Sequence, residues 1–239
     1  RSSHLKPIPS GGGISFVIVS CTACAFSGFW LPLECLPLSI IGFLDDYFGI
    51  SALIRYFFQI ITVYYILLNS TLVNNYFYLF NQFEYILIFL LLLIIGTAII
   101  NFINFMDGLD GFLISNIIII FLTSSILFNQ YILLLVGPLV GFSIMNWQPA
   151  KVFMGDVGST FLGAIFCGMI LQMENWNQAI NVLLISSPIL IDTILCIFLR
   201  FKNKQNIFRP HKYHLYQRLF ESGWPKNKIA LCYIFPTIL

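Results

Sequence analysis

The sequence predicts an all-α, polytopic integral membrane protein, and three observations lead to this prediction. The chain has 239 residues, of which 59% are hydrophobic and only 9% are charged. A soluble domain usually carries roughly 25% charged residues. The apolar residues gather in runs, and the basic residues are sorted to one side of these runs. We therefore expect a single integral-membrane domain over residues 1–239, with about 8–9 transmembrane helices.

Each apolar run is predicted to be helical, because backbone groups inside a bilayer must form hydrogen bonds within their own segment. The runs cover about residues 14–30, 36–44, 53–68, 86–100, 112–128, 131–145, 160–171 and 179–199, and a last run opens at 229. Several runs are shorter than the roughly 20 residues that a span usually needs. The chain starts without Met and stops inside an apolar run, so we expect the domain to be incomplete at both ends.

The basic residues predict an orientation. If the runs cross the bilayer in order, alternate links fall on one side, here called side A. Side A then holds residues 1–13, 45–52, 101–111, 146–159 and 200–228. All twelve Lys and Arg residues lie on or beside side A, whereas the opposite links carry Glu34, Glu84 and Glu174. Cytoplasmic loops are enriched in Lys and Arg, so side A is predicted to be the cytoplasmic face of the inner (plasma) membrane.

The first two polar clusters of side A are rich in Asp. Asp45 and Asp46 are adjacent carboxylates, which are costly at a membrane edge unless a cation or a proton neutralises them. They predict a Mg²⁺ site or a phosphate-handling pair, and a solvated helix end is the alternative. In the second cluster, Asn101, Asn104 and Asp107 are three residues apart and would share one face of a helical turn.

The second cluster continues into two Asp-Gly steps, at Asp107 and Asp110. Glycine permits a tight turn that exposes the backbone to a ligand, so this cluster is a candidate binding loop. A plain turn is the alternative interpretation.

The third cluster runs from Asn146 to Thr160, and Gly155 and Gly158 flank Asp156 within it. Glycines let backbone N–H groups approach an anion, and a helix start favours negative charge. Asp156 is therefore predicted to be a metal ligand, with a simple N-cap as the alternative.

The fourth cluster places His211 and His214 three residues apart, flanked by Arg209 and other basic residues. Imidazole and guanidinium groups suit a diphosphate, although a basic cytoplasmic loop with incidental His is the alternative. Asp192 is a separate case, because it lies inside an apolar run. It is a functional candidate, or it pairs with Arg200 or a neighbouring helix.

In their order along the chain, these clusters resemble the polyprenyl-phosphate N-acetylhexosamine-1-phosphate transferases, the MraY/WecA-like enzymes of glycosyltransferase family 4. The resemblance covers nearly the whole chain. It rests on residues 1–13, 42–46, 101–111, 153–159, 188–192 and 211–218. The last of these segments reads His-x-x-His-x-Tyr-Gln-Arg, which is closest to the WbpL-like O-antigen branch.

The resemblance implies transfer of an N-acetylhexosamine 1-phosphate from a UDP-sugar to undecaprenyl (polyprenyl) phosphate, with release of UMP. This reaction would initiate O-antigen or other cell-envelope polysaccharide synthesis. The implied cofactor is Mg²⁺, with Mn²⁺ as an alternative, bound by Asp156, Asp45 and Asp46. The implied catalytic residues are these three with His211 and His214. The implied substrate-binding residues are Asn101, Asn104, Asp107, Asp110, Asn146, Phe153, Lys6 and Arg209.

The implied partners are therefore a UDP-N-acetyl sugar, the polyprenyl phosphate and the lipid bilayer. We expect no nucleic-acid partner, and a homodimer is left open. Two other interpretations also stay open. One is an ion-coupled transporter that uses Asp107, Asp110 and Asp192, although transporters more often place their carboxylates near the bilayer midplane. The other is an inactive, truncated member of the family.

Overall fold

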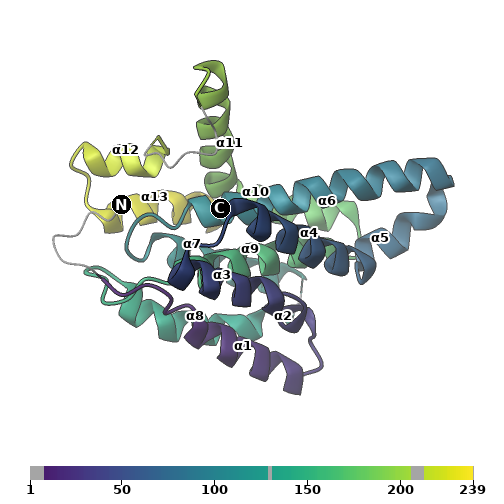
Figure 1. Cartoon of the computed structure of the whole chain (residues 1–239), viewed down its shortest axis with the longest axis horizontal. Helices are drawn as coiled ribbons and strands as arrows, with labels where there is room; N and C mark the ends of the chain where they lie inside the picture. Colours follow the sequence, from purple (N-terminus) through teal and green to yellow (C-terminus); the bar gives the residue numbers. More distant parts are fainter. Residues whose placement is uncertain (1–7, 129–130, 206–212, 239) are drawn as a thin grey trace.

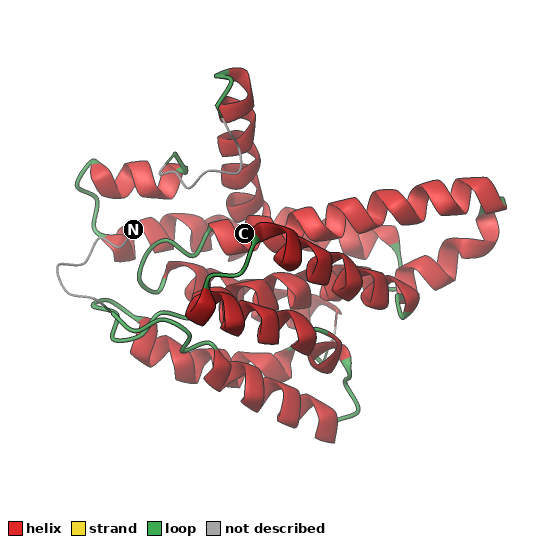
Figure 2. Cartoon of the chain, viewed as in Figure 1, coloured by secondary structure: helices red, strands yellow, loops and turns green. Residues whose placement is uncertain are grey.

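The computed structural model describes residues 8–128, 131–205 and 213–238, and it is helical with no strand in these ranges (Figure 1, Figure 2). The prediction of an all-α fold is confirmed for this part of the chain. The helices in chain order are α1 (Ile14–Phe26), α2 (Leu31–Glu34), α3 (Leu36–Phe48), α4 (Ala52–Leu68), α5 (Thr71–Tyr76), the 3₁₀ helix η1 (Phe77–Leu79), α6 (Gln82–Phe105), α7 (Phe112–Phe128), α8 (Leu133–Asn146), α9 (Gly155–Leu171), α10 (Trp176–Ile185), α11 (Ser187–Lys202), α12 (Leu215–Glu221) and α13 (Lys226–Ile238).

Helix α9 lies at the centre of the bundle (Figure 1). Every residue from Val157 to Leu171 is buried, and α3 and α6 make the most extensive helix contacts with it. Small residues allow this close packing. A Cβ added to Gly163 would stand 2.8 Å from the carbonyl oxygen of Ile100 in α6. The absence of a side chain at Gly163 therefore lets the backbones of α6 and α9 approach each other.

The lengths of the helices bear on the predicted number of spans. By length and composition, α6 could cross a membrane alone. Helices α10 and α11 together are long and apolar enough to form one span, although they are bent by 76° relative to each other. The apolar helices α1, α4, α7, α8 and α9 each have 10–17 residues, which is shorter than the usual span. The number of 8–9 transmembrane helices therefore stays a prediction.

The run predicted as one helix over 179–199 is broken in the structure. Helix α10 ends at Ile185, and α11 begins at Ser187 and projects away from the other helices (Figure 1). Pro188 stands in the first turn of α11 and has no N–H to bond back to α10. The hydroxyl of Ser186 donates to the carbonyl oxygen of Val182, 2.9 Å away, so the break is stabilised locally.

Contacts join several of the described links to one another, whereas the predicted alternation of links across a bilayer stays a prediction. At one end, the Asn69 side chain donates to the Glu34 carboxylate at 2.9 Å, and the Asn75 side chain donates to the Glu174 carbonyl at 2.9 Å. This end carries acidic and neutral polar groups. The opposite ends of α3, α4 and α9 carry Asp45, Asp46, Arg55 and Asp156, which contact one another.

Candidate active site

Two carboxylates from distant parts of the chain meet at one guanidinium. Asp45 lies in the last turn of α3, Asp156 in the first turn of α9 and Arg55 in the first turn of α4. The Nη1 atom of Arg55 donates to Asp45 Oδ2 at 2.7 Å and to Asp156 Oδ2 at 2.9 Å. These are lengths typical of charge-assisted hydrogen bonds. Three helix ends are therefore joined at one point.

Asp46 has a different set of partners from its neighbour Asp45. Its Oδ1 accepts from the backbone nitrogen of Asp156 at 3.0 Å, and its Oδ2 accepts from the backbone nitrogen of Val157 at 3.2 Å. The first N–H groups of a helix have no partner inside the helix. Asp46 therefore acts as an N-cap supplied by another helix, and it fixes where α9 begins relative to α3.

The start of α9 requires glycine at position 155. Gly155 has a φ of +71°, and a Cβ there would collide with the Asp46 carboxylate. The segment before α9 is tied to residues 9–12, since Gly12 N donates to the Phe153 carbonyl at 2.9 Å and Phe153 N donates to the Pro9 carbonyl at 2.9 Å. Phe153, predicted to bind substrate, is thus held beside the Asp46–Asp156 junction by its backbone.

Asp107 lies in the link between α6 and α7 and is half-buried. Burial, together with the smaller effect of the negative charges of Asp156 and Asp46, raises the pKa of its carboxyl to about 7. Perturbed carboxyls gather at functional sites because desolvation and like charges are concentrated there. The Asp107 loop therefore belongs electrostatically to the same site as Asp46 and Asp156.

Asn101 and Asn104 make hydrogen bonds within the bundle. The side-chain amide of Asn101 pairs with that of Gln59 in α4, with contacts of 2.8 and 3.2 Å. The carbonyl oxygen of the Asn104 side chain accepts from the Ser159 hydroxyl at 2.6 Å. Both residues join α6 to its neighbours, and their predicted contact with substrate stays a prediction.

Asp110 and Asn146 tie the side A loops together. The buried Asp110 carboxylate lies 2.9 Å from Lys226 Nζ at the start of α13 and accepts from Ala150 N at 3.1 Å. Asn146 accepts from Gly111 N at 3.2 Å and donates to the Val152 carbonyl at 3.0 Å. A buried pair of this kind holds its loop in place because breaking it leaves an uncompensated charge.

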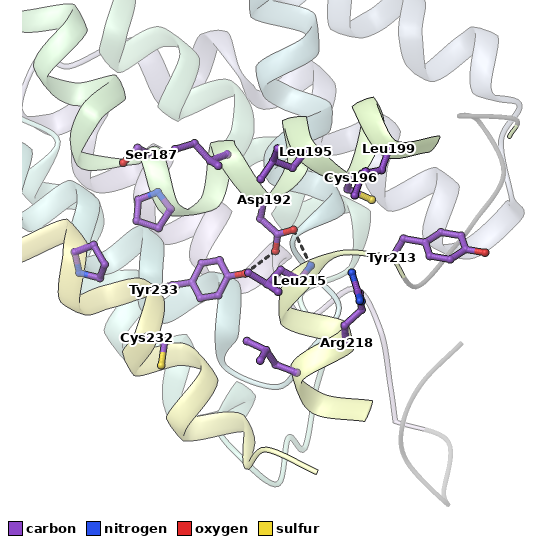
Figure 3. A pocket seen from close by; sticks show the side chains of 14 residues that line it. Ser187, Asp192, Leu195, Cys196, Leu199, Tyr213, Leu215, Arg218, Cys232 and Tyr233 are labelled. Carbon is purple, nitrogen blue, oxygen red and sulfur yellow. Dashed lines mark hydrogen bonds between the residues drawn. The ribbon is translucent and has the colours of Figure 1, made fainter. Parts of the chain in front are cut away.

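Asp192 organises the helices that follow the fourth cluster (Figure 3). Its carboxylate accepts from Leu215 N at 2.8 Å, from Tyr216 N at 3.2 Å and from the Tyr233 hydroxyl at 2.6 Å. It is therefore bonded to neighbouring helices, one of the alternatives that the sequence left open. His214 is only 2% exposed, and its Nδ1 lies 3.6 Å from Asp192 Oδ1.

A cavity of about 490 Å³ lies beside this network, between α11, α12 and α13 (Figure 3). Its lining is mostly apolar, and Asp192, Tyr213 and Arg218 contribute polar groups to it. Lys6, Arg209 and His211 lie outside the described residues, so the structure gives no position for these three predicted site residues.

Comparison with known proteins identifies the family. Residues 29–174, more than half of the chain, match glycosyl transferase family 4. The chain belongs to this family. It is 29% identical to a probable undecaprenyl-phosphate N-acetylglucosaminyl 1-phosphate transferase of Bacillus subtilis, over 93% of this chain and 68% of the relative.

Two phospho-N-acetylmuramoyl-pentapeptide-transferases are also similar to this family 4 chain. The protein of Carboxydothermus hydrogenoformans is 28% identical over 99% of this chain and 84% of its own length. The protein of Fervidobacterium nodosum is 30% identical over 95% of this chain and 79% of its own length. As a family 4 member, the chain is an integral, multi-pass membrane protein.

The residues present can hold a divalent cation of the kind that the family implies. Within the described ranges, no group of three or more His, Cys, Asp and Glu side chains is arranged to bind a metal ion. Two carboxylates, however, point an oxygen each at one nitrogen, in Asp45 and Asp156. Mg²⁺ is commonly held by one or two carboxylates, with substrate phosphates and water completing its shell. This donor set fits Mg²⁺.

Some residues of this family 4 site were missed by sequence reasoning. In the sequence, Arg55 served only as one of the basic residues that predict the orientation in the membrane, and neither Lys226 nor Tyr233 was predicted to belong to the site. A cation in the first turn of an apolar helix is costly unless it is paired. This cost indicates that Arg55 is paired. The sequence does not identify its two partners, because they lie 10 and 101 residues away in the chain.

Proposed function

We propose that this protein transfers an N-acetylhexosamine 1-phosphate from a UDP-sugar to undecaprenyl phosphate, forming a polyprenyl diphosphate sugar and releasing UMP. The reaction is proposed to depend on Mg²⁺, with Mn²⁺ as an alternative. We place it on the cytoplasmic face of the inner membrane, where all twelve basic residues are predicted to lie.

One observation carries this proposal, namely the meeting of Asp45 and Asp156 at Arg55 in a chain of family 4. These carboxylates come from the end of α3 and the start of α9. The sequence predicts that they lie on the cytoplasmic side, where a soluble nucleotide and a membrane phosphate could both arrive. Phosphoryl transfer needs its two anionic groups held together and their charge neutralised, and little further chemistry from the protein.

The proposed roles follow from these contacts. Asp45 and Asp156 bind the cation, which supplies charge neutralisation at the donor diphosphate. Asp46 positions Asp156 by capping α9. Asp107, whose pKa is raised to about 7, is proposed to exchange a proton as substrate binds. Phe153 is proposed to stack on uracil.

The residues of the fourth cluster are given separate roles. His214 is buried beside Asp192, so we assign it to holding its own segment in place. His211, Arg209 and Lys6 are proposed to contact the substrate phosphates. Asn101, Asn104, Asp110 and Asn146 are proposed to shape the nucleotide pocket through the helix and loop contacts described above.

The donor is proposed to be UDP-N-acetylglucosamine or a deoxy relative of it. Support comes from the B. subtilis relative, whose name specifies N-acetylglucosaminyl 1-phosphate transfer. The His-x-x-His-x-Tyr-Gln-Arg pattern at 211–218 also resembles the WbpL-like branch. We therefore propose a role in O-antigen synthesis over one in peptidoglycan synthesis.

The test is UMP release by the purified protein in detergent with undecaprenyl phosphate and Mg²⁺. The donors are UDP-N-acetylglucosamine, UDP-N-acetylfucosamine and UDP-N-acetylmuramoyl-pentapeptide, each with and without EDTA. Lipid-dependent, EDTA-sensitive UMP release from the first or second donor supports the proposal. Release from UDP-N-acetylmuramoyl-pentapeptide alone would show that this compound, and not the proposed one, is the donor. No release from any donor, together with substrate flux in vesicles, would favour the transporter.

A further inference from the structure

Arg55 occupies the place that a divalent cation needs. Its Nη1 atom stands between Asp45 Oδ2 at 2.7 Å and Asp156 Oδ2 at 2.9 Å. The same two oxygen atoms are the ones that converge in the candidate metal site. The Arg55 guanidinium therefore lies at the point where the proposed function requires a divalent cation.

A guanidinium and a divalent cation cannot use these oxygens together. Mg²⁺ takes its oxygen ligands at about 2.0–2.1 Å in nearly octahedral geometry, which leaves no room for a nitrogen between the same two oxygens. The positive charges would also repel each other at this short range. Arg55 must therefore move away from at least one carboxylate when a divalent cation is present.

The surroundings of Arg55 permit such a movement. It lies in the first turn of α4, and its side chain is 35% exposed. A long side chain at a helix end can swing its charged group toward water while its stem stays packed. Without a positive charge nearby, the close carboxylates of Asp45 and Asp156 would repel each other, so the Arg55 guanidinium stabilises this pair.

We propose that Arg55 is an exchangeable counter-ion, which holds Asp45 and Asp156 together in the metal-free protein and gives way when a divalent cation binds. This inference rests on the proposed function, since it takes the metal site from there. It makes Arg55 a positioning residue that lowers the affinity for the cation while keeping its two ligands in place.

The experiment measures Mn²⁺ binding to the purified protein in detergent, without nucleotide or lipid, by electron paramagnetic resonance. Arg55→Gln is expected to lower the Kd for Mn²⁺ about tenfold, which corresponds to two partly exposed ion pairs that no longer have to be broken. Arg55→Lys keeps the charge and should stay near the wild-type Kd. Lys151→Gln removes one charge from an exposed side A residue and should also leave the Kd near wild type.

The outcomes separate the inference from the function on which it rests. An unchanged or higher Kd in Arg55→Gln, or an equal fall in Lys151→Gln, would overturn the exchange. If UMP release stayed intact in the wild type, the proposed function would survive that result. Absence of Mn²⁺ binding in every variant, with no UMP release, would contradict both the exchange at Arg55 and the proposed function.

A second measurement uses the wild-type protein and so does not depend on the folding of a variant. Phenylglyoxal modifies free guanidinium groups, and mass spectrometry reads the extent of modification at Arg55. Mn²⁺ is expected to speed the modification of Arg55 because the guanidinium leaves the two carboxylates. An equal or slower rate with Mn²⁺ would contradict the exchange.

Discussion

Asp46, in the last turn of α3, accepts a hydrogen bond of 3.0 Å from the backbone nitrogen of Asp156, in the first turn of α9. The adjacent Asp45 instead contacts Arg55, which in turn contacts the Asp156 side chain. Two neighbouring carboxylates thus fix the same residue by its backbone and by its side chain. The position of Asp156 is therefore determined by α3 as much as by its own helix.

Asp46→Ala should lower both stability and turnover. Removal of the carboxylate leaves two N–H groups of α9 without their cap, which costs about 1–2 kcal/mol. Thermal unfolding in detergent measures this loss. Asp156→Asn is the matched variant, because Asp46 bonds the backbone of residue 156 and that bond survives. A stable Asp46→Ala protein with an unchanged melting temperature would argue against the cap.

Gly155→Ala should destabilise the protein and abolish turnover. An alanine at a φ of +71° costs about 1–2 kcal/mol, and its Cβ would also collide with the Asp46 carboxylate. The control is Gly137→Ala in α8, where an added Cβ meets nothing within 4 Å. That change should leave UMP release intact and should not lower the melting temperature, because Ala favours a helix interior more than Gly does. Equal behaviour of the two variants would contradict the proposed strain at Gly155.

Asp192→Asn should loosen the start of α12. An amide can accept only one of the two backbone hydrogen bonds from Leu215 and Tyr216 that the carboxylate now accepts. Hydrogen exchange over residues 215–221 is expected to speed up, and turnover to fall. Tyr233→Phe removes only the hydroxyl contact and should give a smaller increase. Exchange rates equal to wild type in Asp192→Asn would show that this carboxylate does not hold α12.

Stability without metal should decrease as pH rises. The pKa of the Asp107 carboxyl is raised to about 7 in the folded protein, whereas an unfolded Asp titrates near 3.9. Between about pH 4 and 7 the folded state therefore holds a proton that the unfolded state has released, and stability falls with pH across this window. Melting in EDTA at pH 5, 6, 7 and 8 measures the slope.

Asp107→Asn is the control for this pH effect, because an amide does not titrate. Its melting temperature should change less between pH 5 and 8 than that of the wild type. A wild-type protein that melts at the same temperature throughout this range, or one that becomes more stable as pH rises, would contradict the raised pKa.

The sequence predicted most of the longer helices, and the structure brings together residues of the first and third polar clusters at one end of the bundle. Apolar runs and charge sorting report directly on burial in lipid, so helices such as α4 and α7 fall within a residue or two of the predicted ranges. The break at Ser186 was not predicted, because a Pro in an apolar run can either kink a span or start a new helix.

The different contacts of the individual site residues could not be predicted from the sequence. Adjacent residues of a helix point in different directions, so Asp45 and Asp46 were bound to differ, but which one faces α9 depends on helix packing. The pairing of Asp110 with Lys226 and the burial of His214 likewise depend on contacts between distant segments. No local pattern around these residues carries that information.

The central claim is that Asp156 binds a cation required for sugar-phosphate transfer to a polyprenyl phosphate. The most direct measurement is UMP release from UDP-N-acetylglucosamine by wild type, Asp156→Asn and Glu174→Gln, each with Mg²⁺ or EDTA and with undecaprenyl phosphate. Glu174 lies at the opposite end of the bundle and serves as the control. We predict release by wild type and Glu174→Gln only with Mg²⁺, and none by Asp156→Asn. Normal release by Asp156→Asn, or release in EDTA, would contradict the account.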